Sequence, residues 1–329
     1  MSKINFIEVR SELGAGTRGA SLGVEALKVA CLQRHFEFWN QYHAYVKAVQ
    51  DSNGALFQKN NFKFAKYVSY IYSHLQHVSL ALNQSLVIQK KFPIVLSADH
   101  SSAYGTIAGV KSAFPQKRLG VVWIDAHADL HSPFSTPSGN MHGMPLAMAM
   151  QASHKESAVN SPQEEEAHYW NAILDIGTHL PKMLPQDLVF VSLRSTEGHE
   201  DEYITRNNIR SISTDELRRK GVQNTLLAIQ EHLKNCDMIY VSFDVDSIDP
   251  IFSRGTGTPE AGGLTPQEAC ALNKGLTMWD KTVAWEVAEI NPLLDNENQM
   301  ALYAADVLLE VVQAVEKRLE TVHNLTANV

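Results

Sequence analysis

Between residues 119 and 150 the chain reads LGVVWIDAHADLHSPFSTPSGNMHGMPLAMAM. The apolar, β-branched run at 121–124 predicts a buried strand. Asp125, His127 and Asp129 follow directly at alternating positions. Since side chains two residues apart on an extended chain point the same way, these three can converge on one point at the end of the strand.

Carboxylate and imidazole groups mixed in this way suit a divalent transition metal such as manganese. Calcium and magnesium prefer ligand sets made only of oxygen. A loop that merely carries three polar residues after a strand would have the same local sequence. The triplet therefore predicts a metal site only if other strand ends supply further ligands.

The overall composition is that of an ordinary soluble protein. With 329 residues the chain could form two domains, although α/β folds of this size often form one. A hydrophobic content of 44% and a charged content of 19% are sufficient for a large core. The formal charge of -8 argues against non-specific nucleic-acid binding, which depends on cationic side chains that neutralise phosphates.

Membrane insertion and secretion are not expected. The sequence lacks a run of about 18 apolar residues that could cross a bilayer. Its first residues, MSKINFIEVRSELGAG, lack the apolar core of a secretory signal. Cys31, Cys236 and Cys270 are too few and too scattered for a disulfide framework or a thiolate metal site. A cytoplasmic location follows as the expectation.

Apolar strands alternate with amphipathic helices along the chain. Strands are expected at 3–9, 93–97, 121–124, 188–193, 237–243 and 282–287, and helices at 24–33, 64–82, 222–233 and 302–319, with further helix starts near Ser101, Ser213 and Thr265. Near-continuously apolar strands indicate a parallel sheet covered on both faces. In such α/β sheets, sites form at the carboxyl ends of the strands.

Two other strand ends carry potential ligands. His100 follows the strand at 93–97, and Asp244 and Asp246 follow the strand at 237–243. Together with the first triplet they make two imidazoles and four carboxylates, which are too many for one ion and suitable for two ions that share bridging carboxylates. The alternative is that these groups satisfy loop backbones at separate strand ends.

One long polar segment does not fit the alternation of strands and helices. Residues 151–168 lack periodicity and are expected to form a surface insertion or a lid, with the acidic run at 164–166 as a solvated face.

Four motifs resemble the ureohydrolase family, which includes arginases and agmatinases. They are ADHSSAYG, DAHADLHSPFSTPSGNMHGMPL, SFDVDSIDPIFSRGTGTPEAGGLT and EINP, and they cover residues 97–292 in family order. The segment SGNMHG resembles the arginase branch in particular. This resemblance implies one three-layer α/β/α domain over residues 1–329, built on a mainly parallel eight-stranded sheet. It also implies two divalent ions per subunit, most often Mn²⁺ with Co²⁺ or Ni²⁺ as alternatives, and a homotrimer or homohexamer.

The resemblance also assigns roles to the ligands and their neighbours. It makes Asp125 and Asp244 bridges between two ions, with His100 and Asp129 completing one coordination sphere and His127 and Asp246 the other. The implied reaction is attack of a bridging hydroxide on the guanidinium carbon of L-arginine, which gives L-ornithine and urea. Asp129 would pass a proton to the leaving amine. His142 would shuttle protons, Glu289 would hold the guanidinium, and Thr258 would lie beside it.

The amino-acid end of the substrate is where this chain departs from the family pattern. Thr136, Ser138 and Asn140 match positions that bind the α-carboxylate. His131 stands where better-known arginases have an asparagine, and Glu197 stands where they have an aspartate near the α-amine. The RSTE sequence around Glu197 resembles a divergent bacterial branch of arginases.

Other functions remain open at this point. GTGTPEAGG resembles agmatinases and guanidinobutyrases as much as arginases, so a hydrolase of agmatine or of another guanidino or formimino compound is the main alternative. A deacetylase of related fold fits less well with a second motif of the DxDxxDP type, and the EINP carboxylate would repel the phosphate of a phosphoesterase substrate. A catalytically silent regulatory or structural member of the family is the alternative from another class. Such proteins usually lose ligands, whereas this chain retains all six.

Overall fold

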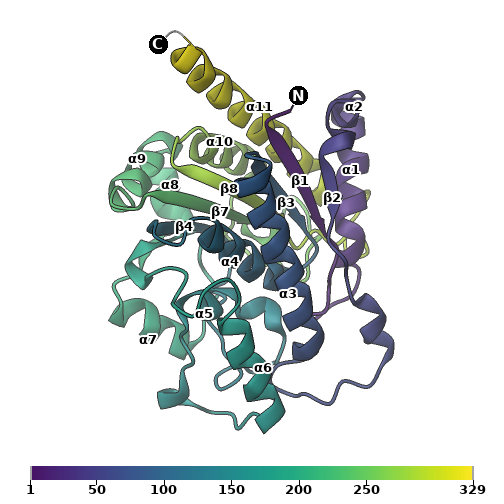
Figure 1. Ribbon diagram of the computed structural model, residues 1–329, viewed down its shortest axis with the longest axis vertical. Coiled ribbons are helices and arrows are strands. Elements are labelled where there is room, and N and C mark those ends of the chain that lie inside the picture. Colours follow the sequence, from purple (N-terminus) through teal and green to yellow (C-terminus); the bar gives the residue numbers. More distant parts are fainter. Residues whose placement is uncertain (1, 328–329) are drawn as a thin grey trace.

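The computed structural model describes residues 2–327, which form a central sheet between two layers of helices (Figure 1). The sheet has eight strands in the order β2-β1-β3-β8-β7-β4-β5-β6, and every neighbouring pair is parallel. In chain order the strands are β1 (Ile4–Val9), β2 (Val46–Ala48), β3 (Phe92–Ser97), β4 (Leu119–Ile124), β5 (Leu188–Val191), β6 (Arg210–Ile212), β7 (Met238–Asp244) and β8 (Thr282–Ala288). The predicted α/β class and three-layer architecture are confirmed.

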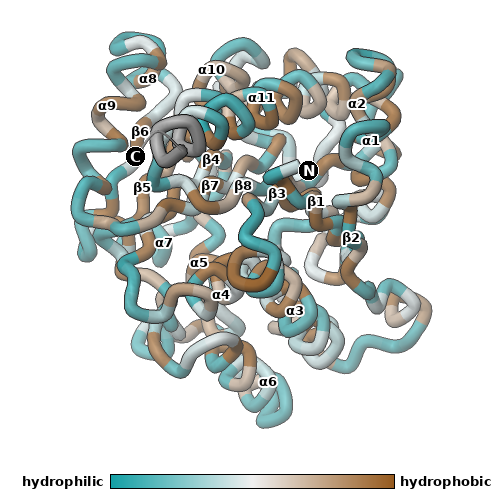
Figure 2. Tube along the Cα trace, turned by 45° about the horizontal axis from the view of Figure 1, so that its top comes forward, coloured by the Kyte–Doolittle hydropathy of each residue, from teal (hydrophilic) through white to brown (hydrophobic). Residues whose placement is uncertain are grey.

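Each face of the sheet is covered by its own group of helices. One face packs against α1 (Gly23–Arg34), α2 (Phe38–Tyr42), α8 (Thr214–Lys220), α9 (Val222–His232), α10 (Pro266–Thr277) and α11 (Gln299–Ala327). The other packs against α3 (Val68–Asn83), α4 (Ala103–Ala113), α5 (Pro145–Met150), α6 (Glu164–Leu174) and α7 (Gly198–Arg206). In Figure 2, α5 is hydrophobic along its length, which agrees with the burial of all six of its residues.

The alternation of side chains along the strands explains the two cores. In β4, Val122 and Ile124 pack into the core beneath α10 and α11, whereas Val121 and Trp123 pack into the core beneath α3 and α4. Successive residues of a strand point to opposite faces, so a strand that is buried on both faces must be apolar throughout. All six residues of β4 are buried.

The order of the strands brings distant motifs together. β3, β8, β7 and β4 are consecutive neighbours at the centre of the sheet. Ile124, the last residue of β4, pairs with Phe243 of β7, and Phe243 also pairs with Val287 of β8. Because these strands are parallel, the polar residues that follow each of them emerge at the same edge.

The predicted elements are present, and residues 2–327 also contain two strands and four helices, α2, α5, α6 and α7, that were not predicted. All six predicted strands are found, and Thr265 caps α10 by accepting a hydrogen bond from the Glu268 amide in a capping box. The short strands β2 and β6 were not predicted. They contain only three residues each and are partly exposed, so they lack the apolar run that marks the central strands.

The helix expected from residue 64 begins instead at Val68. The amides of Phe64 and Ala65 donate hydrogen bonds to Glu166 Oε1, at 2.7 and 2.9 Å, which ties this stretch to another part of the chain. The apolar pattern of the sequence includes residue 64 because the Phe64 side chain is partly buried. Its backbone is nevertheless not helical, so the pattern placed the start of the helix too early.

The predicted excursion at 151–168 is shorter than expected. The irregular surface run ends at Gln163, because α6 begins at Glu164 with a capping box between Gln163 and Glu166. The prediction of a solvated acidic face was wrong for Glu166, whose side chain is fully buried and also accepts from the Gln163 amide. Within residues 2–327 no helix is long and apolar enough to cross a membrane.

Candidate dinuclear metal site

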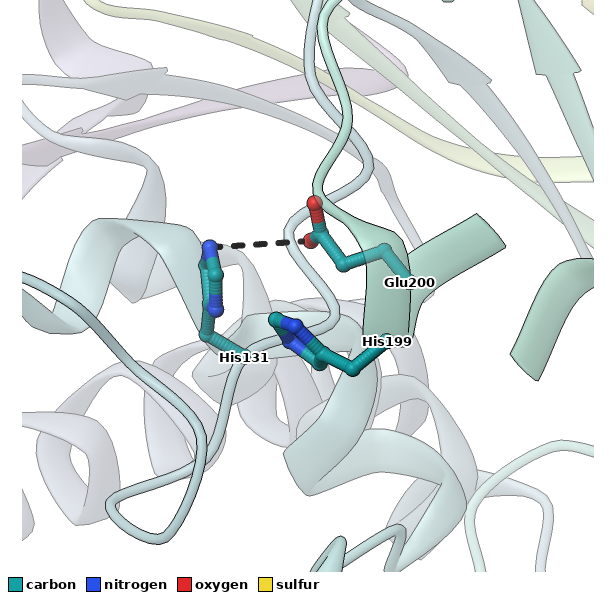
Figure 3. A group of neighbouring side chains, drawn as sticks. All are labelled: His131, His199 and Glu200. Atoms are coloured by element: carbon teal, nitrogen blue, oxygen red, sulfur yellow. Dashed lines mark ion pairs between the residues drawn. The ribbon is translucent and has the colours of Figure 1, made fainter. Parts of the chain in front are cut away.

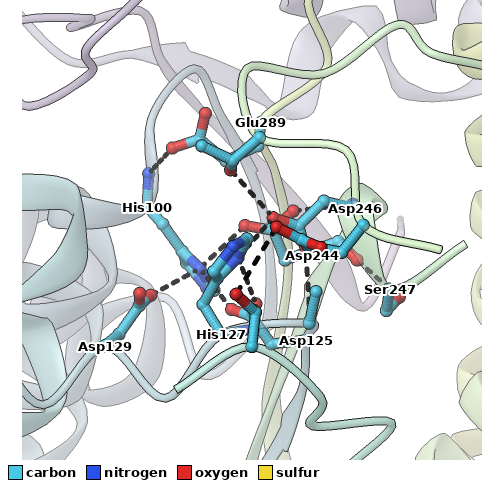
Figure 4. A network of polar contacts seen from close by, with 12 residues as sticks. His100, Asp125, His127, Asp129, Asp244, Asp246, Ser247 and Glu289 are labelled. Atoms are coloured by element: carbon cyan, nitrogen blue, oxygen red, sulfur yellow. Dashed lines mark hydrogen bonds and ion pairs between the residues drawn. The ribbon is translucent and has the colours of Figure 1, made fainter. Parts of the chain in front are cut away.

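The six predicted ligands lie together at the carboxyl edge of the central strands (Figure 4). β3 is followed by a short 3-10 helix, His100–Ser102, and β7 by another, Val245–Ser247. The triplet follows β4 without any helix, since residues 125–131 form an irregular loop. Five of the six ligands are nearly inaccessible to solvent, and His127 is partly exposed. The six are His100, Asp125, His127, Asp129, Asp244 and Asp246.

His100 is the imidazole at the centre of the first half of the cluster. Its Nδ1 lies 3.0 Å from Oδ2 of Asp125, 3.0 Å from Oδ2 of Asp244 and 3.2 Å from Oδ2 of Asp129. Its ring stacks on Trp123 at 4.1 Å, with 9° between the planes. Its Nε2 lies 2.7 Å from Ser242 Oγ. Trp123 and Ser242 therefore fix the ring so that Nδ1 faces three carboxylates.

His127 occupies the second half of the cluster. Its Nδ1 lies 2.9 Å from Oδ2 of Asp246 and 3.6 Å from Oδ1 of Asp125. Thr258 donates from Oγ1 to the same Asp246 oxygen at 3.2 Å. The two halves are joined by Asp125, which faces both imidazoles.

Backbone amides hold the carboxylates in place. The amide of His127 donates to Asp125 Oδ1 at 2.6 Å, and the amide of Asp246 donates to Asp244 Oδ1 at 2.8 Å. The Arg194 guanidinium donates to the carbonyl of Asp246 and, at 2.8 Å, to that of Glu260, so it fastens the β7 loop to the following glycine-rich loop. The carboxylates are thus oriented before any ligand binds.

The site's electrostatics are those of a concentrated, buried set of charges. Burial lowers the pKa of His127, but Asp246 and Asp125 outweigh burial and raise it to about 12. Burial and then the charges of Asp246 and Asp125 raise the pKa of Asp244 well above its ordinary value. Carboxyl groups that lie close together in an environment of low dielectric constant cannot all be ionised unless nearby cations balance their charges. The imidazoles play that part when protonated.

The same residues fit divalent metal ions. His100 Nδ1 and Asp125 Oδ2 are buried and lie 3.0 Å apart, yet neither has a hydrogen bond of acceptable geometry within residues 2–327. Two overlapping triplets, His100 with Asp125 and Asp129, and Asp125 with His127 and Asp246, each place their donor atoms within 4.8 Å of one another. Asp125 belongs to both. Imidazole and carboxylate donors with a shared carboxylate suit a pair of transition-metal ions.

A cavity of about 200 Å³ opens above the cluster. Its walls are formed by five of the six ligands, all except Asp125, and by residues of the 131–143 loop and the 195–200 segment. They include His131, Ser138, Asn140, His142, Glu197, Glu200 and Thr258. The structure thus brings most of the predicted substrate contacts to one cavity.

Besides the ligand Asp125, two predicted residues lie outside the lining of this cavity. Thr136 is buried, and its Oγ1 accepts hydrogen bonds from the amides of Ser138 and Gly139, so it shapes the loop. Glu289 lies beside the cluster, where its Oε1 accepts from the His100 amide at 2.9 Å and lies 3.0 Å from His142 Nδ1.

Two of the predicted site residues have left-handed backbone. Asp129 has φ of 50° and Glu289 has φ of 69°. Left-handed backbone at a residue with a side chain costs about 1–3 kcal/mol and occurs mainly at functional sites. The surrounding hydrogen bonds hold both carboxylates in orientations that a relaxed loop would not give.

Several residues near the site were not found from the sequence. Ser242 and Trp123 are strand residues whose contacts with His100 depend on neighbouring strands. Lys66 Nζ donates to Asn140 Oδ1 at 2.9 Å from a segment 74 residues away. Glu200 could have been noticed, because Glu197 and Glu200 have the spacing of a capping box, which the structure forms at the start of α7.

Residues 2–313 match the sequence profile of the Arginase family. The chain belongs to this family. Among its relatives, the arginase of Bacillus subtilis (strain 168) is 30% identical over 307 residues, which are 93% of this chain and 96% of that protein. The arginase of Bacillus caldovelox is 30% identical over 313 residues, which are 94% and 97% of the two chains.

Solved structures of the arginase family agree with this assignment. The crystal structure of arginase from Bacillus cereus aligns with a TM-score of 0.78 at 28% identity, and covers 94% of this chain and 98% of its own. Formimidoylglutamase from Bacillus subtilis has a TM-score of 0.72 at 18% identity, which shows the shared fold alone. The protein is therefore a metal-dependent hydrolase of the ureohydrolase type.

Proposed function

We propose that the protein hydrolyses the guanidinium group of L-arginine to L-ornithine and urea. The observation that carries this choice of substrate is that Ser138 and Asn140 line the cavity and that Asn140 Oδ1 accepts a hydrogen bond from the ammonium of Lys66. Hydroxyl, amide and ammonium groups together suit an α-carboxylate, which arginine has and agmatine lacks.

Two ions, which we expect to be Mn²⁺, would be held by the six ligands, with Asp125 and Asp244 shared. The chemistry that two bound divalent ions supply is a water made nucleophilic at neutral pH. The remaining steps belong to the chain's own side chains.

Glu289 would orient the guanidinium group. One of its oxygens already accepts from the His100 amide and faces His142, so the carboxylate cannot rotate freely. A planar cation paired with a fixed carboxylate places its carbon at a defined position over the metal cluster.

His142 and Asp129 would handle protons. His142 lines the cavity, and its imidazole can exchange protons between the cluster and solvent. Asp129 also lines the cavity and would pass a proton to the leaving amine. Thr258, which donates to Asp246, would help to hold the ligand loop next to the guanidinium.

The cavity lining formed by the 131–143 loop and the 195–200 segment would bind the amino-acid end of arginine. Ser138 and Asn140 would contact the α-carboxylate, with Thr136 holding their loop. Glu197 and His131 would lie near the α-amine and the carboxylate. Their side chains face each other, with His131 Nε2 4.0 Å from Glu197 Oε1.

A substrate panel tests this proposal. Release of urea, or of the equivalent product, is measured for L-arginine, agmatine, guanidinobutyrate and formiminoglutamate after loading with Mn²⁺, Co²⁺ or Ni²⁺. We expect kcat/KM for L-arginine to exceed that for agmatine by about 100-fold or more, because agmatine lacks the carboxylate that the polar groups of Ser138 and Asn140 would bind. Comparable turnover of agmatine and arginine would reject arginine as the substrate.

Two further expectations can be measured on the same protein. Metal analysis after manganese loading should give two ions per chain, and fewer than one ion per chain would favour a catalytically silent family member. Light scattering should show a homotrimer or a homohexamer.

A further inference from the structure

A second cluster of metal-binding side chains lies next to the six ligands and shares none of them. It consists of His131, His199 and Glu200, whose donor atoms lie within 4.8 Å of one another (Figure 3). We infer that these three residues form a third metal site, separate from the dinuclear cluster, for a transition-metal ion of the zinc class.

Glu200 is a rigid, buried carboxylate. Its side chain is almost completely inaccessible to solvent. Oε1 accepts from the Leu130 amide at 3.1 Å, and Oε2 accepts from the Glu197 amide at 3.0 Å. Each oxygen keeps a second lone pair, and Oε1 lies 3.9 Å from Nε2 of His131. Oε1 is therefore a fixed oxygen that faces the imidazole and could ligate a metal ion, and no hydrogen bond joins the two side chains.

The histidines around Glu200 have ring nitrogens that nothing else satisfies. His199 Nε2, His131 Nδ1 and His154 Nε2 are all buried, and none has a hydrogen-bond partner in the part of the chain that the structure describes. The rings of His131 and His199 are 4.7 Å apart, and those of His199 and His154 are 5.6 Å apart. Buried polar atoms are normally paired, so three orphan nitrogens in contiguous rings indicate a missing partner.

The donor set selects the class of ion. Two imidazoles and one carboxylate are ligands that Zn²⁺ takes when it keeps a fourth position open. Ca²⁺ and Mg²⁺ prefer oxygen ligands alone. His131 and Glu200 line the same cavity as the dinuclear ligands, so the open position would face that cavity.

Metal counting on the full-length protein tests the site. The chain is stripped with a chelator, loaded with Zn²⁺ at about pH 8 and analysed by elemental mass spectrometry. Burial raises the pKa of Glu200 to about 7, so this side chain is ionised at that pH. We expect three ions per chain in the wild type and two in His199→Ala. The matched control, His43→Ala, removes an exposed histidine of another surface and should retain three.

Anomalous diffraction at the zinc edge locates the ions independently of turnover. We expect a peak between His131, His199 and Glu200 that is lost in His199→Ala and retained in Asp125→Asn, which disturbs only the dinuclear cluster. The inference is overturned if the wild type binds no more than two ions, if His199→Ala still binds three, or if the peak is absent. None of these readouts depends on which guanidino compound the enzyme hydrolyses.

Discussion

His142 Nδ1 lies 3.0 Å from Glu289 Oε1, across 147 positions of the chain. The same oxygen accepts a hydrogen bond from the His100 amide. Burial lowers the pKa of His142, but the carboxylates of Glu289, Asp129 and Asp99 together outweigh burial and raise it to about 9. One carboxylate oxygen therefore links the loop after β8, the loop after β3 and the 131–143 loop, and it keeps an imidazolium at the edge of the cavity.

Replacing this imidazole should affect catalysis far more than metal binding. In His142→Asn we expect kcat for L-arginine to fall about 10²–10³-fold, because positioned acid–base groups contribute in that range. Steady-state urea release measures the change, and the metal content should equal that of the wild type. His179→Asn, at an exposed histidine, is the control. A decrease in kcat of less than threefold in His142→Asn would contradict a proton-transfer role.

The hydroxyl of Ser242 should control metal affinity through His100. Ser242→Ala removes the 2.7 Å contact to His100 Nε2 that orients the ring. Residues that orient a metal ligand typically change affinity by about 10–100-fold when they are lost. Competition with a chelator of known affinity measures the manganese affinity. Ser79→Ala, at another buried serine, is the control and should leave the manganese affinity unchanged. Equal affinities in the two variants would show that the Ser242–His100 contact does not affect metal binding.

Lys66 should discriminate arginine from substrates without a carboxylate. In Lys66→Met we expect KM for L-arginine to rise about 10-fold, since a charge-assisted contact contributes roughly 1.5–3 kcal/mol when made directly and less through Asn140. Turnover of agmatine should change little. Lys63→Met removes a nearby exposed lysine that lies over Phe64 and serves as the matched control. An equal loss for arginine and agmatine would indicate a structural role for Lys66.

His74 should make the fold sensitive to acid. Its ring is buried between the Gln50 carbonyl and the Ser102 hydroxyl. Burial lowers its pKa from 6.5 to about 4. Between these values the unfolded chain binds a proton that the folded chain does not, so stability is complete above pH 6.5 and decreases as the pH falls toward 4.

The expected size of this loss is about 3 kcal/mol, at 1.36 kcal/mol for each pKa unit. Urea denaturation at several pH values measures it. In His74→Gln the free energy of unfolding should fall less between pH 6.5 and 4 than in the wild type. His77→Gln, at an exposed position of the same helix, should behave as the wild type. Parallel pH profiles for all three proteins would assign the acid sensitivity to other groups.

Sequence reasoning succeeded where the signal is local. The apolar run before Asp125, the alternation of Asp125, His127 and Asp129, and the capping box at Thr265 each lie within a few residues, and each determines local geometry. The long polar stretch was interpreted less well. Glu166 has the composition of a solvated face, but its burial depends on the amides of Phe64 and Ala65, which no local pattern reveals.

The sequence by itself determined that three strands are followed by imidazole and carboxylate groups of the kind that suit divalent ions. Only the tertiary structure decided which strands are neighbours, because the order β3-β8-β7-β4 arises from crossovers and not from chain order. That order places Ser242 beside His100 and His142 beside Glu289. It also leaves His131, His199 and Glu200 in contact beside the cavity. Such contacts depend on the register of parallel strands and on loops that cross between them, whereas side-chain periodicity reports only the faces of a single element.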